Sequence, residues 1–471
     1  MATTLANIRS QTRPVLALAL PLILAEVGWM FMAVTDTIMV GHLPHPAMTI
    51  SAAALAQVLY NTLAFGIGGV LLGLDTYLSQ AHGAGEIDNA NRWLFHGFLM
   101  AAILSGVLYA VIAAAQLALA RMPIDPAILR QSVSFLKALN LSSPALMLYL
   151  TLRRYLQAFN HVRPIAIALV SANLINALGD WLLLFPHHWA LLSLPGYGVT
   201  GAAISTTISR YYLFALLLAA LWWMNRRHDY GLLTMPRHFE LWRLQRLALL
   251  GAPVGGQIFV EISIFAAVTA LAGTLGPLPL AGHEIALNCA SITWMVPFAI
   301  SAAGSVRVGQ AIGRRAPDEA AAAGWNGISL GAIFMLSASV VLLVFPHTIA
   351  HAFTADAAVI AATVPLLLVA AAFQFFDGLQ VTAAGALRGV GNTHAGLIVQ
   401  IVGYWLVGLP IGWLLAFREN LGAVGLWLGL CAGLAVAGPA LIVIWHRAAH
   451  GIAKTLPVGL AEPTANLISR D

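Results

Sequence analysis

The sequence predicts an all-α polytopic membrane protein in which twelve transmembrane helices form two pseudo-symmetric six-helix bundles. Its composition, its series of apolar spans and an internal repeat all lead to this prediction. Of the 471 residues, 60% are hydrophobic and only 9% are charged, whereas a soluble chain carries about 25% charged residues. The mean hydropathy is +0.85. The chain therefore lacks the polar surface of a soluble protein, and we interpret it as an integral membrane protein.

The apolar spans have the length of bilayer-crossing helices, which need about 20 predominantly apolar residues. Twelve are found, at 15–40, 50–73, 95–119, 133–152, 164–185, 199–223, 247–273, 284–306, 324–346, 358–386, 395–417 and 421–446. A transmembrane β-barrel would instead show segments of about ten residues with alternating hydrophobicity. The spans therefore favour helices.

Basic residues indicate the orientation, because Lys and Arg in short loops favour the cytoplasmic side. With the N-terminus inside, eighteen basic residues fall on the cytoplasmic side, and three, Arg121, Arg130 and Arg418, fall outside. This predicts a cytoplasmic N-terminus (1–14), an N-terminal bundle (15–223), a cytoplasmic linker (224–246), a C-terminal bundle (247–446) and a cytoplasmic tail (447–471). The arginines stand singly or in pairs at span ends, so the net charge of +5 indicates topology and not a nucleic-acid partner.

An internal repeat relates the two halves. Gln80-Ala81-His82-Gly83 corresponds to Gln310-Ala311-Ile312-Gly313 at an offset of 230 residues, and Gly198-Val199-Thr200-Gly201 corresponds to Gly422-Ala423-Val424-Gly425 at an offset of 224. An even number of spans separates the copies, so both halves enter the membrane in the same direction. Parallel repeats of this kind occur in transporters, with sites within or between the bundles.

Four carboxylates, Asp36, Asp180, Glu261 and Asp377, lie in or at the margin of apolar spans. An ionised acid at bilayer depth costs about 3 kcal/mol on insertion scales, so such acids mark candidate functional sites. Asn176 precedes Asp180 by four residues, which places both on one helix face. An interfacial position for Asp36 and an interhelical hydrogen bond for Asn176 are the alternatives.

Structural salt bridges are the alternative for Glu261 and Asp377, but the only basic residue that we place inside a bundle is Arg210. A hydrogen-bonded protonated acid is the alternative for Glu26, in the middle of the first span. We expect the two acids near span ends, Asp75 and Glu284, to be interfacial.

Aromatic rings near the acids could line a cavity and hold a flat cation by cation–π attraction, with core packing or lipid contact as the alternative. We assign the substrate cavity to Phe265, Asn288, Phe373, Gln374 and Tyr404. Nucleotide-binding and hydrolase motifs are missing from the sequence, and its two cysteines form no metal-binding pattern. We therefore predict no enzymatic activity and no cofactor or resident metal, and expect an ion gradient to drive any pumping.

Several strings resemble the multidrug and toxic compound extrusion (MATE) family, in particular its bacterial NorM-like branch. They are Asp36-Thr37-Ile38-Met39-Val40-Gly41, Gly251-Ala252-Pro253-Val254-Gly255, the Glu261 segment, Ala281-Gly282-His283-Glu284-Ile285-Ala286-Leu287-Asn288, Ser305-Val306-Arg307-Val308-Gly309 and the stretch from Asp377 to Gly389. The resemblance covers about residues 15–446. It implies two bundles arranged as a V and export of cationic, often aromatic, drugs in exchange for Na⁺ or H⁺.

The same resemblance implies roles for the acids. Glu261 and Asp377 match the cation site of the C-terminal bundle, while Asp36, Asn176 and Asp180 match the polar cluster of the N-terminal bundle. Two departures leave the coupling ion and its bundle open. Phe373 stands where some relatives have a tyrosine, and Asp180 stands where some NorM-like members have an asparagine.

We interpret the chain as a secondary active multidrug exporter of the bacterial inner membrane, with both termini cytoplasmic, that works by antiport and contributes to antibiotic resistance. Its expected partners are cationic drugs and dyes and the lipid bilayer, and we expect a monomer. A flippase for a lipid or lipid-linked precursor is the first alternative, but it would favour a cavity lined by basic residues. A membrane-embedded enzyme and a passive channel are the others.

Overall fold

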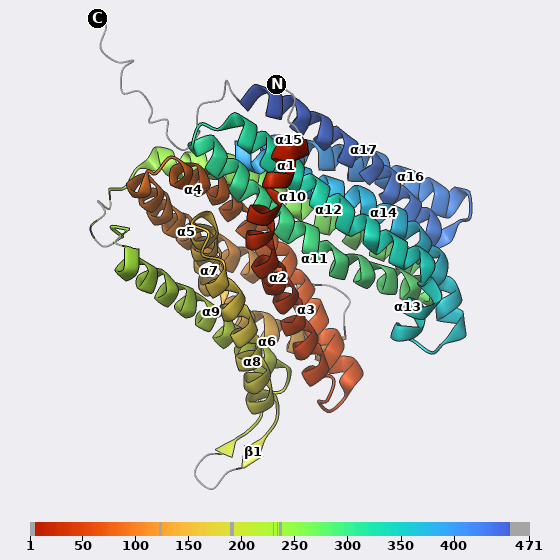
Figure 1. The fold of residues 1–471 in the computed structure, drawn as a ribbon. Helices are drawn as coiled ribbons and strands as arrows, with labels where there is room; N and C mark the ends of the chain where they lie inside the picture. Colours follow the sequence, from red (N-terminus) through yellow and green to blue (C-terminus); the bar gives the residue numbers. More distant parts are fainter. Residues whose placement is uncertain are drawn as a thin grey trace, which may run out of the picture. The chain divides into compact units, whose positions relative to one another are not determined.

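The computed structural model describes residues 5–121, 125–188, 193–228, 230–232, 234 and 238–452. Helices make up nearly all of this part (Figure 1). The predicted cytoplasmic tail from 453 onward, residues 1–4 and Arg237 of the linker lie outside the described residues.

The first half of the chain forms these elements. They are α1 (Leu5–Ser10), α2 (Thr12–Val40), α3 (Pro46–Gly68), the 3₁₀ turn η1 (Gly69–Gly73), α4 (Leu74–Gly83), α5 (Ile87–Leu119), α6 (Pro126–Asn140), α7 (Ser143–Ala158), α8 (Arg163–Leu184), the short antiparallel hairpin β1 (His187–His188) and β2 (Ser193–Leu194), and α9 (Val199–His228). Proline opens α3 and α6 within the first turn, where its missing N–H has no helical partner to lose.

The second half forms a similar series. It comprises α10 (Leu241–Thr274), α11 (Pro277–Gly313), α12 (Pro317–Val344), α13 (Pro346–Phe353), α14 (Ala357–Val390), α15 (His394–Gln400), the π-helical η2 (Ile401–Gly408), α16 (Leu409–Trp413), the π-helical η3 (Leu414–Arg418) and α17 (Gly422–Gly451). Asp356 caps α14 by accepting from the backbone N–H groups of Ala358 and Val359, which satisfies donors that have no partner inside the helix.

The spans agree with the twelve predicted from the sequence. In the described part, eleven helices are long and apolar enough to cross a bilayer, and a bent pair, α6 and α7, supplies a twelfth. The predicted span 133–152 is this pair, which bends by 46° at its break. Pro144 occupies the first turn of α7, where it favours a new helix start over continuation of α6.

The helices group into two compact units. Unit 1 comprises Met1–Ile23, Asp75–Ala90 and Ala252–Asp471, and unit 2 comprises Leu24–Leu74 and Asn91–Gly251. These units divide the chain differently from the predicted bundles, because 15–23 and 75–90 belong to unit 1 and 247–251 to unit 2. The bundle boundaries at 223 and 247 stay a prediction.

In unit 2, small residues allow α8 and α9 to approach closely. A Cβ on Gly201 would lie 2.5 Å from the Leu183 carbonyl oxygen, and one on Gly179 would lie 2.5 Å from the Ser205 Oγ. Membrane helices associate through such close backbone contacts, because lipid tails leave no hydrophobic drive between helices. This packing brings the polar residues of α8 and α9 together.

In unit 1, α11, α14 and α17 surround a core that contains Trp427, and a second core contains Trp445. Glycines of α17 face the π-helical stretch before α16: a Cβ on Gly433 would lie 2.5 Å from the Gly403 carbonyl oxygen. The wider turn of a π-helix shifts the side chains that follow it, and such turns are frequent at functional sites. Tyr404 lies in this stretch and is fully buried.

The two copies of the repeat motif pack against each other within unit 1. Residues 80–83 end α4, and 310–313 end α11. A Cβ on Gly83 would collide with the Gln310 carbonyl oxygen, and a Cβ on Gly313 would collide with the Gln80 carbonyl oxygen. This contact is reciprocal, as expected of segments related by a local two-fold axis.

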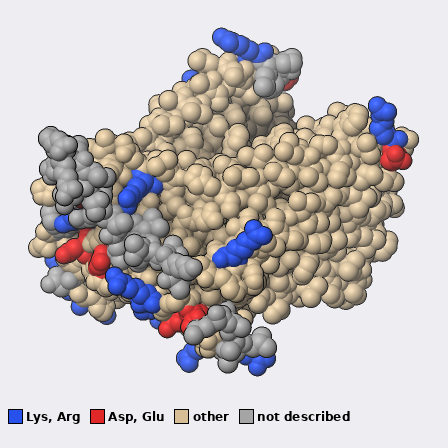
Figure 2. All heavy atoms as spheres, turned by 90° about the horizontal axis from the view of Figure 1, so that it is seen from above, with Lys and Arg blue, Asp and Glu red and all other residues tan. Residues whose placement is uncertain are grey.

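The described surface is mostly apolar. Figure 2 shows wide areas without a charged side chain, with the charges in small separate groups. Leu174, Leu249 and Ile333 each expose about two thirds of their surface, at 65%, 67% and 65%. Exposed apolar area on this scale is expected where lipid replaces water.

Candidate functional site

The first candidate site lies in unit 2 and is formed by Asp36, Asn176, Asp180, Ser205 and Thr206, here called the unit 2 acid cluster. All five are buried. Thr206 Oγ1 donates to Asp36 Oδ2 at 3.0 Å, and Ser205 Oγ donates to the Asn176 carbonyl oxygen at 2.8 Å. The Asp180 carboxyl and the Asn176 amide lie beside Asp36. The three sequence-predicted residues are therefore neighbours in the structure.

The two carboxyl groups of this cluster cannot both be ionised and remain adjacent without a compensating charge, because like charges at short range repel strongly. Asp36 Oδ1 and both Asp180 oxygens have no donor among the described residues. The cluster is therefore suited to hold a proton or a small cation between the two acids. Asp36 is 4% exposed, so its predicted alternative, an acid solvated at the interface, does not fit this structure.

A basic side chain, Arg210, accompanies the unit 2 acid cluster. It lies one turn after Thr206 on α9 and is buried. Its guanidinium lies 4.8 Å from the centre of the Tyr60 ring and 5.8 Å from that of Trp29. Its Nη1 donates to Ser142 Oγ at 2.8 Å.

Glu26 and Arg153 form a buried ion pair beside Tyr149 in unit 2. Both Arg153 and Arg154 are buried in α7, so the prediction that Arg210 is the only basic residue inside a bundle is wrong. The sequence places these arginines beside the polar end of a span, and α7 continues past them to Ala158. This pair replaces the predicted alternative of a hydrogen-bonded protonated acid for Glu26.

The second candidate site, in unit 1, is formed by Glu261, Asp377, Gln400, Tyr404 and Trp294, here called the unit 1 acid cluster. Gln400 Nε2 donates to Glu261 Oε2 at 3.0 Å, and the Trp294 indole lies beside the same carboxyl. Asp377 is 3% exposed and is close enough to Glu261 for their charges to interact. In the described part of the chain, neither acid forms a salt bridge.

Aromatic rings adjoin the unit 1 acid cluster. Phe265 packs edge to face against Phe373 at 6.1 Å and against Tyr404 at 6.2 Å, and Phe373 contacts Trp427 at 5.6 Å. Phe265 is half-buried, whereas Phe373 and Tyr404 are buried in the core. Only Phe265 of these three predicted cavity residues therefore has substantial exposed surface.

The two predicted amide residues of the cavity occupy different environments. Gln374 is fully buried, and its Nε2 donates to Thr293 Oγ1 of α11 at 2.6 Å. Asn288 is exposed, and its Nδ2 donates to the Glu284 carbonyl oxygen on its own helix. The assignment of the cavity to these residues stays a prediction.

Two polar groups near these rings are not among the site residues predicted from the sequence. His283 accepts a hydrogen bond from Trp427 Nε1 at its Nδ1, at 3.1 Å, and its Nε2 lies 2.8 Å from Thr269 Oγ1. Since an indole N–H can only donate, Nδ1 of His283 must be unprotonated and Nε2 must carry the proton. Gln400, the donor to Glu261, is a single amide in an apolar span, and only the tertiary structure shows its contact with this acid.

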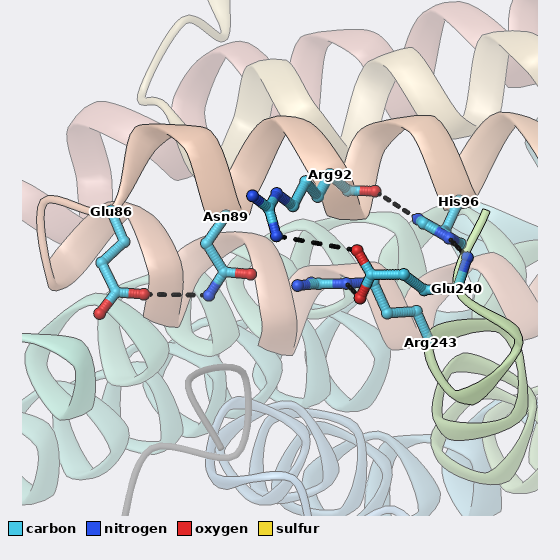
Figure 3. A network of polar contacts seen from close by, with 6 residues as sticks. All are labelled: Glu86, Asn89, Arg92, His96, Glu240 and Arg243. Carbon is cyan, nitrogen blue, oxygen red and sulfur yellow. Dashed lines mark hydrogen bonds and ion pairs between the residues drawn. The ribbon is translucent and has the colours of Figure 1, made fainter. Parts of the chain in front are cut away.

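A polar network joins α5 to the start of α10 in unit 2 (Figure 3). Arg243 Nε donates to Glu240 Oε2 at 2.9 Å, and Arg92 lies 3.8 Å from Glu240. His96 Nε2 accepts from the Glu240 backbone N–H at 2.9 Å. Burial favours a higher pKa for Glu240, but the hydrogen bond and charge of Arg243 outweigh it and lower the pKa below the ordinary value for glutamate.

Asp75 differs from its prediction as an interfacial acid. It is fully buried within unit 1, and Arg388 Nε lies 3.5 Å from its Oδ2. The neighbouring Thr76 donates to the Arg388 carbonyl oxygen at 2.6 Å. Sequence position near a span end could not distinguish this buried pair from an acid in water.

Comparison with known proteins places the chain in a class. The MatE family model matches residues 21–182 and again 253–414, so two copies of one module lie 232 residues apart. A duplicated helical module with buried acids in both halves defines a polytopic membrane transporter built from a parallel repeat. The chain belongs to the MatE family.

Individual relatives cover nearly the whole chain. A probable multidrug resistance protein NorM of Mesorhizobium japonicum is 33% identical over 446 residues, 93% of this chain and 94% of that protein. The multidrug resistance protein PmpM of Pseudomonas aeruginosa is 30% identical over 456 residues, 94% and 93% of the two chains. These matches confirm the resemblance to the NorM-like branch.

Solved structures share the fold. The eukaryotic MATE transporter AtDTX14 superposes with a TM-score of 0.84 at 22% identity, over 95% of this chain and 99% of that one. An outward-facing multidrug resistance MATE transporter of the MOP superfamily gives 0.84 at 17% identity, over 97% and 100%. The predicted MATE fold of twelve helices is therefore confirmed.

Proposed function

We propose that this protein exports cationic, lipophilic aromatic compounds by antiport with Na⁺ or H⁺, as a secondary active multidrug transporter. The observation that carries the proposal is the unit 1 acid cluster, in which Glu261 and Asp377 are close together without an ion pair in the described part of the chain. Two acids in such a place become neutral by taking up protons or a cation from outside the protein, and they can release them again. The two acids are therefore suited to bind and release the Na⁺ or H⁺ that is exchanged for the exported compound.

The substrate class follows from the surroundings of the acids. Phe265 presents part of its ring beside Phe373 and Tyr404, and Trp29 and Phe65 present theirs near the unit 2 acid cluster. Aromatic faces attract cations, and buried carboxylates favour positive charge. The relatives named as multidrug resistance proteins support a drug-like substrate.

The cellular setting that we propose is the bacterial inner membrane, with both termini in the cytoplasm. The basic residues at one set of span ends support this orientation, and the bacterial relatives support the compartment. We propose transport as a monomer, with no catalytic step and with Na⁺ or H⁺ as a second substrate.

Transport in proteoliposomes tests the proposal. Ethidium movement is measured with an inward-directed Na⁺ gradient, with a pH gradient, and with neither. We expect one gradient to drive ethidium against its own gradient. Movement that follows only the ethidium gradient under all three conditions would indicate a passive channel and contradict antiport.

A further inference from the structure

Arg210 is a buried cation that forms no ion pair with a carboxylate among the described residues. It is 4% exposed, and within the described residues no carboxylate lies within 4.0 Å of its guanidinium. Nη1 donates to Ser142 Oγ, while Nε has no hydrogen-bond partner. Buried charges in proteins are ordinarily paired or fully hydrogen-bonded. Arg210 therefore occupies its position at a cost, and the aromatic rings are its main partners.

These rings form an aromatic cage, defined here as Trp29, Tyr60, Phe65 and Tyr149. Trp29 stacks on Tyr149 with 6.2 Å between ring centres and an interplanar angle of 17°, and it contacts Phe65 at 6.4 Å. The Tyr60 hydroxyl is fixed by Ser143 Oγ at 3.0 Å. Trp29 and Phe65 are half-buried, so each keeps part of its surface exposed.

A planar cation over such rings gains cation–π attraction that grows when water is excluded. The guanidinium of Arg210 is itself a planar cation, and it fills the position over Tyr60 and Trp29. An aromatic cation of the kind proposed as substrate would seek the same ring faces. The side chain and such a substrate cannot occupy them together.

Arg210 also has an alternative partner nearby. Thr206, one turn earlier on α9, holds Asp36 by a hydrogen bond, and the charge of Arg210 acts on Asp36. Asp36 from α2 and Asp180 from α8 are carboxylates of this region. A third, Glu26, lies with its partner Arg153 beside Tyr149 of the cage and is already paired. A guanidinium that leaves the rings can form a charge-assisted hydrogen bond with Asp36 Oδ1, which has no donor among the described residues.

We infer that Arg210 is a tethered cation that occupies the aromatic cage in place of a cationic substrate and moves to Asp36 when a substrate enters. The identity of the substrate rests on the proposed function. When a substrate occupies the cage, Arg210 is paired with Asp36. Asp36 then cannot bind a coupling cation or proton at the same time. Such mutual exclusion is a coupling free energy between two sites.

Binding to the purified full-length protein tests this inference. Tetraphenylphosphonium serves as the aromatic cation, and triphenylphosphine oxide as a neutral control, each measured by equilibrium dialysis. Arg210→Gln empties the cage, so we expect tetraphenylphosphonium to bind about 2- to 30-fold more tightly, the range of cation–π strength. Affinity for the neutral compound should be unchanged. Arg210→Lys keeps the charge but not the planar guanidinium, so its gain should be smaller than that of Arg210→Gln.

Two further variants separate competition from a structural effect. Tyr60→Leu in the Arg210→Gln background should remove the gain, because the ring face is lost. Ser142→Ala removes the acceptor of Arg210 Nη1 and should give a smaller gain than Arg210→Gln, because Arg210 keeps its charge but is held less firmly over the rings. This mild variant provides the test if Arg210→Gln does not fold.

Unchanged or weaker binding of tetraphenylphosphonium to folded Arg210→Gln, or to Ser142→Ala where Arg210→Gln does not fold, would overturn the inference. An equal gain in affinity for the neutral compound would also overturn it, since the gain would then come from the smaller side chain and not from competition between cations. Wild-type transport of tetraphenylphosphonium in proteoliposomes is measured separately. Its failure would count against the proposed function, whereas the affinity ratio between variant and wild type still decides the role of Arg210.

Discussion

The two acid clusters differ in how their negative charge is met. In unit 2, Asp36 lies close enough to Arg210 for their charges to interact, and Glu26 is paired with Arg153. In unit 1, Glu261 receives a hydrogen bond from neutral Gln400, and Asp377 has only Glu261 as a charged neighbour among the described residues. Unit 2 carries its own cations, whereas the unit 1 acid cluster depends on a cation or proton from outside.

This difference separates two roles for buried charge. An acid paired with a resident arginine contributes to the folded state, and removing one partner leaves the other buried and unpaired. An ionised acid without such a partner does not stabilise the folded state. Its presence is better explained by binding and release of a proton or cation during transport. Substitutions in the ion pair of unit 2 should therefore affect mainly stability, and substitutions in the unit 1 acid cluster should affect mainly transport.

The largest expected effect is on stability, at Glu26. Glu26→Leu leaves Arg153 buried without its carboxylate, which should lower the free energy of unfolding by about 3–5 kcal/mol. Thermal unfolding in detergent, followed by circular dichroism, measures the loss. Glu26→Leu combined with Arg153→Met should recover most of it, because both charges are then gone. A double variant as unstable as the single one would show that the pair is not the cause.

The next effect is on transport, at the unit 1 acid cluster. Glu261→Gln and Asp377→Asn should each reduce gradient-driven export by about 5- to 150-fold, the range of typical coupling energies. Their melting temperatures should not fall, because no buried base loses its partner. Glu284→Gln, a half-buried acid of α11, is the matched control and should transport normally. Wild-type export by both cluster variants would remove these acids from the mechanism.

The third effect compares the neutral donors to the two clusters. Gln400→Leu removes the hydrogen bond to Glu261, and Thr206→Val removes the hydrogen bond to Asp36. Hydrogen bonds to charged groups are worth about 1.5–3 kcal/mol. The loss of each bond is measured as the change in the Na⁺ or H⁺ concentration that gives half-maximal export. Gln400→Leu should shift this dependence more, because Asp36 keeps Arg210 nearby. An equal shift in both variants would contradict the comparison.

The smallest effect concerns Glu240 in the network of Figure 3. Because its folded-state pKa is depressed, its ion pairs stabilise the protein above the unfolded-state pKa, and this contribution is lost as the pH falls through the folded-state pKa. Partly exposed pairs contribute about 0.2–1 kcal/mol. The melting temperature of Glu240→Gln should lie slightly below that of wild type at pH 7, and the difference should vanish in acid. A gap that persists at pH 3 would assign the effect to packing.

Much of the fold and part of the candidate site could be predicted from the sequence. The spans, the parallel repeat and the family strings predicted the fold, because hydropathy and motif spacing are local properties of the chain. The proximity of Asp36, Asn176 and Asp180 agrees with their grouping by resemblance. The positions of Asp75, Arg153 and Arg154 were wrongly expected, since a polar residue at a span end can face water or turn into the protein.

The sequence by itself determined that this chain crosses a membrane many times as a duplicated module and keeps acids at depth. Local composition settles both points, because a helix in lipid must be apolar along its length. Only the tertiary structure decided which acids have a resident cation. Gln400 lies 139 residues from Glu261, and Arg153 lies 127 residues from Glu26. Contacts of that kind depend on how helices pack, and no periodicity or motif in one segment encodes them.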